Sequence, residues 1–300
     1  MSWPVRIGVN PLSWMNDDLP SLGGETALET ALREGKAIGY AGFELGNKFP
    51  KDGPALKAKL DEFGLACVSG WYSGELACGT VEAEKRRCHA HMDKLRFNDC
   101  KVVVYGEVAD SVQGQIDTPL DRRPRFASDA QWQAYAQRLN DFGAHLKSSY
   151  GITLAYHHHM GAYVESPEDI DKLMALTDPA SVSLLFDTGH AYYGGAADPN
   201  ALLARHVQRV AHVHCKDVRP ALIAKARNDG WSFLTGVLAG TFTVPGDGAI
   251  DFDAVLATLH RAGYRGWLVV EAEQDPAVAP SYAYAKKGYE TLERIVDRMS

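Results

Sequence analysis

The chain has 300 residues, of which 46% are hydrophobic and 23% are charged, and its formal net charge is −7. This composition is ordinary for a soluble globular protein with a sizeable core, and the acidic balance gives no support for a nucleic-acid partner, which usually shows a basic face. No apolar run reaches the roughly 18 residues that a membrane span needs. We expect no signal peptide, because the first residues lead directly into a predicted strand. The scattered cysteines form no CxxC pair, which predicts reduced thiols and a cytoplasmic location.

Short apolar segments with strand character alternate along the chain with segments of helical periodicity. The predicted strands are 6–10, 42–46, 65–71, 100–105, 152–156, 182–186, 210–217 and 267–270. The predicted helices are 26–38, 54–63, 81–97, 129–149, 167–176, 200–207, 219–228, 252–262 and 281–299. Alternation of this kind predicts parallel βαβ units, and eight such units predict a (β/α)8 TIM barrel that forms a single domain over residues 1–300. We find no Gly-x-Gly-x-x-Gly turn and no P-loop, which disfavours a nucleotide-binding open sheet.

Two segments depart from this repeat, and we expect both to act as lids. Residues 106–128 have no clear periodicity, and a loop of this length in a compact domain is usually functional. Its Arg122, Arg123 and Arg125 could contact a substrate anion or could simply be solvated. The second segment, residues 219–248, follows the seventh strand and includes an apolar, glycine-rich stretch.

Four of the predicted strands deliver a histidine or a carboxylate at their C-terminal ends. These residues are His157, Asp187, His214 and Glu271. In a parallel barrel such ends meet at one rim, where the active site lies. Two imidazoles and two carboxylates at that rim would suit a divalent transition metal. Asp187 alone could instead cap a helix, and a lone histidine is usually a core residue, but candidates from separate strands are harder to explain in that way.

Further polar residues follow the same strands. Strand alternation puts His159 on the same side as His157, so His159 could contact a substrate. His190 lies in the loop after the sixth strand. Lys216 is either functional or forms a weak surface pair with Asp217. Glu273 has the same parity as Glu271 and is either a supporting residue or exposed to solvent.

The ordered set of motifs resembles the xylose isomerase-like TIM barrels and, more narrowly, the inosose dehydratases of the IolE/MocC family. The broader likeness rests on DTGH at 187–190, HVHCKD at 212–217, VPGDGAIDF at 244–252 and VE at 270–271. The narrower likeness rests on NPLSW at 10–14, NDD at 16–18, ELGNKFP at 44–50, SGWYSG at 69–74, YHHHMG at 156–161 and VVEAEQDP at 269–276. The likeness covers nearly the whole chain, and the ordered set is more specific than any one motif.

The resemblance implies a hydro-lyase of inositol catabolism. It would convert scyllo-inosose (2-keto-myo-inositol) to 3D-trihydroxycyclohexane-1,2-dione and water, with Mn2+ or Co2+ as cofactor. Position by position, Asp187, His214 and Glu271 match the metal ligands of the superfamily. The superfamily commonly has a glutamate where this chain has His157, so the fourth ligand stays open.

Elimination of water beside a ketone needs a base for the α-proton and an acid for the leaving hydroxyl. The candidates are Glu271, Lys216, His190 and His159, and we favour Glu271 or Lys216 as base and a histidine as acid. A polyhydroxylated ring also needs hydrogen-bonding groups and an aromatic wall. The expected substrate contacts are Asn10, Trp14, Glu44 and Trp71.

Three other functions stay open at this point. A sugar or keto-sugar isomerase or epimerase would share the barrel and the metal, so the site residues barely discriminate it. A phosphodiester-cleaving enzyme like endonuclease IV would need more ligands and a basic surface, against the net charge of −7. A non-catalytic sugar-binding protein is disfavoured by the retained metal-ligand set. The expected partner is a small polyol ketone, without nucleic acid or membrane, and a homo-oligomer is compatible with the sequence.

Overall fold

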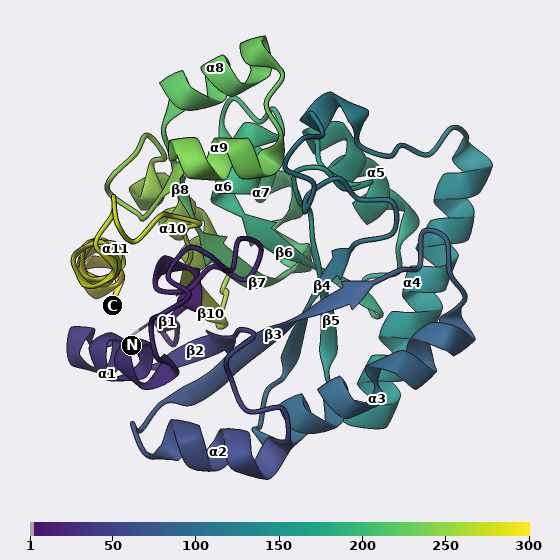
Figure 1. Ribbon diagram of the computed structural model, residues 1–300. Helices are drawn as coiled ribbons and strands as arrows, with labels where there is room; N and C mark the ends of the chain where they lie inside the picture. The colour runs from purple at the N-terminus through teal and green to yellow at the C-terminus, as the bar shows by residue number, and fades with distance from the viewer. Residues whose placement is uncertain (1–2) are drawn as a thin grey trace.

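The structure is a computed structural model that describes residues 3–300. Its strands form a closed parallel barrel in the order β1-β10-β7-β6-β5-β4-β3-β2 (Figure 1). The barrel strands are β1 (Arg6–Val9), β2 (Gly42–Leu45), β3 (Ala66–Gly74), β4 (Val102–Glu107), β5 (Thr153–His157), β6 (Val182–Asp187), β7 (Val210–Cys215) and β10 (Trp267–Val270). The predicted TIM barrel is therefore confirmed.

Helices surround the barrel, and most begin at a side-chain cap that the sequence provides. The helices between and after the barrel strands are α1 (Leu28–Ile38), α2 (Gly53–Asp61), α3 (Val81–Phe97), α4 (Asp129–Tyr150), α5 (Pro167–Leu176), α7 (Pro199–His206), α10 (Phe252–Arg261) and α11 (Ser281–Met299). Ser166 caps α5 in a capping box with Asp169, and Asp251 caps α10. The apolar face of α4, which includes Trp132 and Leu146, is buried against the barrel.

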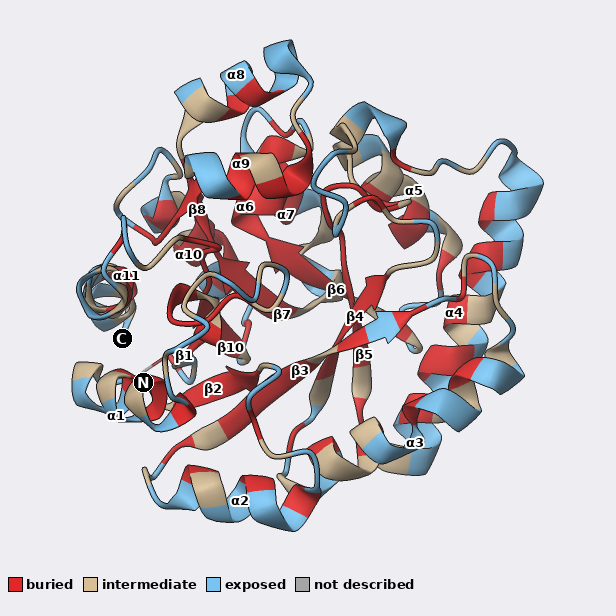
Figure 2. Ribbon diagram, in the orientation of Figure 1, coloured by how far each residue is buried: buried red, intermediate tan, exposed pale blue. Residues whose placement is uncertain are grey.

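The core occupies the layer between the strands and these helices, and Figure 2 shows buried strands inside helices whose outer faces are exposed. The C-terminal end of the barrel is different, because many of its buried residues are polar or charged. Examples are Glu44, His157, Asp187, His214 and Lys216, each at most 2% exposed. Burying charged groups costs free energy unless they are paired or bind an ion. The C-terminal end of the barrel is therefore the candidate location of the active site.

Four short elements were missed by the sequence prediction. They are α6 (Thr188–Tyr193), α9 (Phe233–Ala239) and the antiparallel strands β8 (Asp217–Val218) and β9 (Phe242–Thr243). Helix α6 follows β6 without a loop, because the Asp187 side chain accepts the His190 N–H and starts the helix at once. The 219–248 segment folds into α8 (Pro220–Asp229), α9 and β9, which pack on one another around Ile223, Phe233 and Val237.

The 106–128 segment, which contains the 3-10 helix Leu120–Arg122, is fastened to the loop between β5 and α5. The Arg123 guanidinium donates to the carbonyl oxygens of Ala162 and Tyr163 and lies 2.7 Å from Asp169 and 3.3 Å from Glu165. Arg123 therefore does not contact a substrate anion, nor is it solvated. The single domain and the role of both segments as lids stay predictions. Within residues 3–300, no helix has the length and apolar character needed to cross a membrane.

Candidate active site

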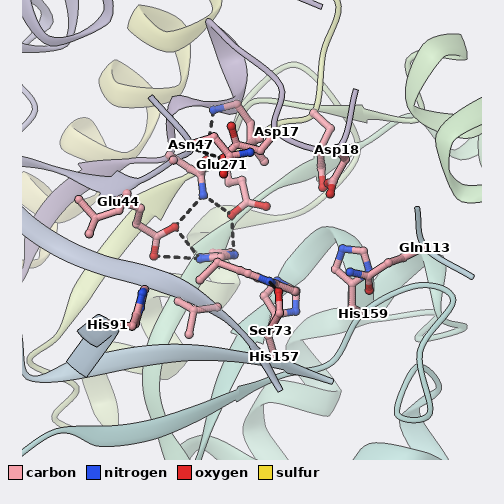
Figure 3. Close-up of a pocket in the computed structure, with 18 of the residues that line it drawn as sticks. Asp17, Asp18, Glu44, Asn47, Ser73, His91, Gln113, His157, His159 and Glu271 are labelled. Atoms are coloured by element: carbon pink, nitrogen blue, oxygen red, sulfur yellow. Dashed lines mark hydrogen bonds and ion pairs between the residues drawn. The ribbon is translucent and has the colours of Figure 1, made fainter. Parts of the chain in front are cut away.

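A cavity of about 350 Å³ opens at the C-terminal end of the barrel (Figure 3). Its size is within the range of small-molecule sites. Its wall comes mainly from residues at the ends of β1, β2, β3, β5, β7 and β10. The lining residues include Asn10, Asp17, Asp18, Glu44, Asn47, Trp71, Ser73, Gln113, His157, His159, His214, Glu271 and Glu273. The polar strand ends predicted to converge do meet here.

The four predicted metal ligands lie together: His157, His214 and Glu271 line the cavity, and Asp187 is fully buried beside them. One ligand atom from each of His157, Asp187, His214 and Glu271 lies within 4.8 Å of all the others. Nδ1 of His214 is 2.6 Å from Oε2 of Glu271 and 3.4 Å from Oδ2 of Asp187, and Nε2 of His157 is 3.6 Å from the same Asp187 oxygen. Each comes from a different strand, so the barrel itself fixes their separation.

These residues fit a divalent metal ion. Although Oδ2 of Asp187 and Nδ1 of His214 are buried and lie close to other charged groups of the cluster, neither makes a well-formed hydrogen bond among the described residues, as buried polar atoms normally do. Burial alone would lower the pKa of His214, but Glu271 and Glu44 together raise this pKa well above its usual value. The carboxylates thus favour positive charge beside Nδ1, and a set of two imidazoles and two carboxylates suits a first-row divalent ion.

Neighbouring groups orient the two histidines. Glu44 lies 2.7 Å from Nε2 of His212 and 3.1 Å from Nε2 of His214. Nδ1 of His214 is therefore the nitrogen that faces Asp187 and Glu271. Asn10 donates to Glu44 at 2.8 Å and to Glu271 at 3.3 Å. Nδ1 of His157 lies 2.7 Å from the His158 carbonyl oxygen, which assigns its proton to Nδ1 and leaves Nε2 free to bind an ion. Such contacts fix the tautomer and orientation of metal ligands.

Lys216 is fully buried against this cluster, so the surface pair considered from the sequence is wrong. Its Nζ lies 2.7 Å from Glu271, 2.8 Å from Glu273 and 3.4 Å from Asp187. Burial alone would lower the pKa of Lys216, but the three carboxylates raise it above its usual value. For Glu271 burial acts to raise the pKa, and His214 and Lys216 together outweigh it and lower the pKa to about 2. Asp217 instead binds the backbone N–H groups of the loop before α10, including Gly248 at 2.9 Å.

The rings of His159 and His190 lie with their centroids 4.0 Å apart and their planes tilted by 38°, and both rings lie beside that of Phe233. Burial is the main cause that lowers the pKa of each well below its usual value, so both are neutral near pH 7. Nδ1 of His159 lies 2.8 Å from the Met160 carbonyl oxygen, which puts its proton on Nδ1. His159 lines the cavity, and its Nε2 is therefore the nitrogen with a lone pair.

Of the expected substrate contacts, Asn10, Glu44 and Trp71 line the cavity, but Trp14 does not. The 3-10 helix Pro11–Ser13 turns Trp14 back onto the core, where its indole N–H donates to Glu34 at 2.6 Å. We therefore withdraw Trp14 as a substrate contact.

The cavity also contains residues that the sequence analysis did not single out. Gln113 reaches it from the aperiodic 106–128 segment, and its Oε1 is buried without a partner in the part of the chain that the structure describes. No periodic pattern marked it. Asp18 lies in a loop that was noted only as a motif, and burial is the main cause that raises its pKa to about 6. Glu273, which the sequence analysis left as either a supporting residue or exposed to solvent, also lines the cavity and is buried, at 1% exposure.

Comparison with known proteins agrees with this architecture. The family model for xylose isomerase-like TIM barrels matches residues 32–295. The rhizopine catabolism protein MocC of Rhizobium meliloti is 46% identical, over 97% of this chain and 88% of that protein. An inosose dehydratase of Clostridium botulinum is 44% identical, over 95% of both proteins. A crystal structure of the IolI protein with a bound zinc atom has a TM-score of 0.66 and 15% identity, over 98% of both chains.

Proposed function

Because the chain belongs to the xylose isomerase-like TIM-barrel family, and within it to the group of MocC and the inosose dehydratases, we propose that it dehydrates an inosose. The substrate is scyllo-inosose, and the products are 3D-trihydroxycyclohexane-1,2-dione and water. The observation that carries this choice is the identity of 44% with an inosose dehydratase over 95% of both chains. The site geometry supports it but also fits an isomerase, since both reactions begin with loss of an α-proton.

The metal centre of this enzyme is formed by His157, Asp187, His214 and Glu271, and the ion is Mn2+ or Co2+. The donor set of two imidazoles and two carboxylates supports this assignment, and so do two buried ligand atoms that make no well-formed hydrogen bond in the described chain. When bound, such an ion supplies a positive charge that stabilises negative charge on the oxygens of a ketone and its neighbouring hydroxyl. With His157 in place of the usual glutamate, the cluster carries one negative charge less than its relatives in the superfamily.

His159 is the base, in place of Glu271 or Lys216. The Lys216 ammonium is held among three carboxylates and has no lone pair to offer, and Glu271 is engaged with Lys216 and His214. His159 presents the lone pair of Nε2 to the cavity while Nδ1 donates to Met160. His190 does not line the cavity, and its ring packs against that of His159.

The same imidazole can complete the elimination. Nε2 of His159 takes the α-proton, the electron pair of that C–H bond forms the new carbon–carbon double bond, and the carbon–oxygen bond to the β-hydroxyl breaks. The imidazolium then passes its proton to the leaving hydroxyl, which departs as water. The enol that remains tautomerises to the dione. One group that serves both steps requires that the proton and the hydroxyl leave from the same face of the ring.

Polar residues around the cavity bind the hydroxyl groups of the ring. Asn10, directly after β1, lines the cavity. Glu44 from β2 and Gln113 from the 106–128 segment lie on opposite sides of it (Figure 3). Trp71 forms the aromatic wall, with its ring 5.7 Å from that of His157 and 5.9 Å from that of His159. We retain as proposals a cytoplasmic location, the absence of a nucleic-acid partner, and a homo-oligomer.

Product analysis tests this function. Protein loaded with Mn2+ is incubated with scyllo-inosose, and the products are separated and identified by NMR. The dione supports the proposal, whereas an epimerised inosose without loss of water moves the function to the isomerase and epimerase class.

A further inference from the structure

The Lys216 ammonium lies among three carboxylates beside the proposed metal centre. Its Nζ contacts Oε1 of Glu271 at 2.7 Å, Oε2 of Glu273 at 2.8 Å and Oδ2 of Asp187 at 3.4 Å. Two of these carboxylates, Asp187 and Glu271, also belong to the proposed metal centre. Carboxylates shared between two cations are the usual arrangement of sites that hold two metal ions a few ångströms apart.

Further potential ligands stand beside the ammonium. One nitrogen or oxygen atom from each of His159, His190 and Glu273 lies within 4.8 Å of the other two. Nε2 of His190 is 3.7 Å from Oε1 of Glu273 and is buried without a hydrogen-bond partner among residues 3–300. Because Nδ1 of His190 accepts the Met160 N–H at 3.2 Å, Nε2 carries the ring proton, which a metal ion would displace. The molecule thus has a second donor group of two imidazoles and a carboxylate, next to the first.

Contacts with neighbouring residues fix the position of the Lys216 side chain. Its backbone N–H donates to the Thr188 hydroxyl at 3.0 Å, and Nζ lies 4.8 Å from the centre of the Phe242 ring. A side chain at position 189 would collide with the lysine, because a Cβ on Gly189 would lie 2.7 Å from Cγ of Lys216. The lysine side chain therefore passes over a glycine to reach the carboxylates.

The charges around this position also favour one metal ion. The Lys216 ammonium already supplies a cation to Asp187, Glu271 and Glu273. A second divalent ion beside the ammonium would place two cations against each other in a buried site, which costs free energy. Lys216 thus supplies the positive charge of a second cation but, unlike a metal ion, cannot dissociate from the site.

We propose that the Lys216 ammonium occupies the second cation position of a two-cation cluster, so that this chain binds one divalent ion, and that removal of the ammonium opens a second metal site at Glu273, His190 and His159. This inference rests on the proposed metal centre.

Metal stoichiometry tests this proposal directly. Metal-stripped wild-type protein and the Lys216→Ala and Lys216→Gln variants are equilibrated with excess Mn2+, freed of unbound ion, and measured for manganese per chain and by electron paramagnetic resonance. We expect one ion in the wild type and two in each variant, with the broadened spectrum of a spin-coupled pair. The double variant Lys216→Ala/Glu273→Gln should return to one ion, and Lys225→Ala, at an exposed lysine, should bind one.

The outcomes separate the two proposals. A wild type that binds no ion overturns the metal centre and this inference together. A wild type with one ion and folded variants that also bind only one overturn the role of Lys216 and leave the metal centre intact. If both variants fail to fold, titration of the wild type decides, because a second, spin-coupled Mn2+ in the wild type overturns the proposal and a single class of site supports it.

Discussion

The carboxylate of Glu44 lies 3.1 Å from Nε2 of His214, on the opposite side of the ring from Asp187 and Glu271. The two residues come from β2 and β7 and are 170 positions apart in the sequence. This contact fixes which nitrogen of His214 faces the cavity. Removing it leaves all four proposed ligands in place but frees one of them to rotate.

Glu44→Gln should therefore weaken metal binding without abolishing it. We expect a loss of affinity of about 10- to 100-fold, which is typical when a group that orients a ligand is changed. Competition with a chromophoric chelator measures the Mn2+ affinity of the variant and the wild type. Glu34→Gln is the control, since Glu34 binds Trp14 away from the cavity. Equal affinities of Glu44→Gln and the wild type would show that this contact does not organise the site.

Changing His159 should separate chemistry from metal binding. His159→Gln removes the proposed base, and we expect kcat to fall by about 10²- to 10⁴-fold, the usual contribution of a positioned acid or base. The bound Mn2+ should stay at the wild-type level because His159 is not one of the four ligands. In the wild type, stereospecifically deuterated substrate should show loss of the proton and the hydroxyl from the same face. A variant with wild-type kcat, or loss from opposite faces, contradicts this role.

Glu107, at the end of β4, should make stability fall as pH rises. Burial is the main cause that raises the pKa of Glu107 to about 7, against a usual value of 4.5. Between these values the unfolded chain gives up the proton first, so ionisation favours the unfolded state. The penalty is absent below about pH 4.5 and complete above about pH 7, where it amounts to about 3 kcal/mol.

Urea unfolding of the wild type and of Glu107→Gln between pH 4 and pH 8 measures this effect. Ala77 donates its N–H to Oε2 of Glu107 and Ala109 donates to Oε1, so the single oxygen of the glutamine keeps one of these two hydrogen bonds. Loss of the other lowers the stability of the variant by an amount that does not depend on pH. We expect the free energy of unfolding of the wild type to fall relative to that of Glu107→Gln as the pH rises from 4 to 8. Parallel curves for the two proteins would assign the pH dependence to other groups.

Arg123 should hold the 106–128 segment in place. Arg123→Ala leaves Glu165 and Asp169 without their buried cation, and breaking a buried ion pair of this kind costs about 3 kcal/mol. Thermal melting should show a lower Tm, and limited proteolysis should cut the segment faster. Arg122→Ala is the matched control, because that side chain is 76% exposed. Equal changes in Tm and in cleavage rate for the two variants would show that Arg123 does not anchor the segment.

The barrel could be predicted from the sequence because each strand is a short apolar run that alternates with a helical pattern. The metal-ligand candidates could be named because His157, Asp187, His214 and Glu271 follow such runs directly. Parallel strands in a closed barrel bring their C-terminal ends together, so position along the chain was enough to predict that these residues meet.

Other features depend on contacts that no local pattern encodes. In the sequence, Lys216 and Asp217 look like an ordinary surface pair after β7. The contacts of Lys216 with Glu271 and Glu273 exist only because the fold brings the end of β10 beside the end of β7. Trp14 was expected at the cavity because it stands among polar residues, but one turn of 3-10 helix directs it to the core. Helix α6 was missed because its six residues are too few for periodicity to show.

The most direct test of the proposed function is a paired assay on metal-stripped protein with scyllo-inosose. Mn2+ or Co2+ is added back, and formation of the dione is followed by its ultraviolet absorbance, with the products checked by chromatography. We predict dione only when the metal is present, and none from folded Asp187→Asn protein under the same conditions. Turnover of the metal-free protein, or an isomerised inosose in place of the dione, would contradict the account.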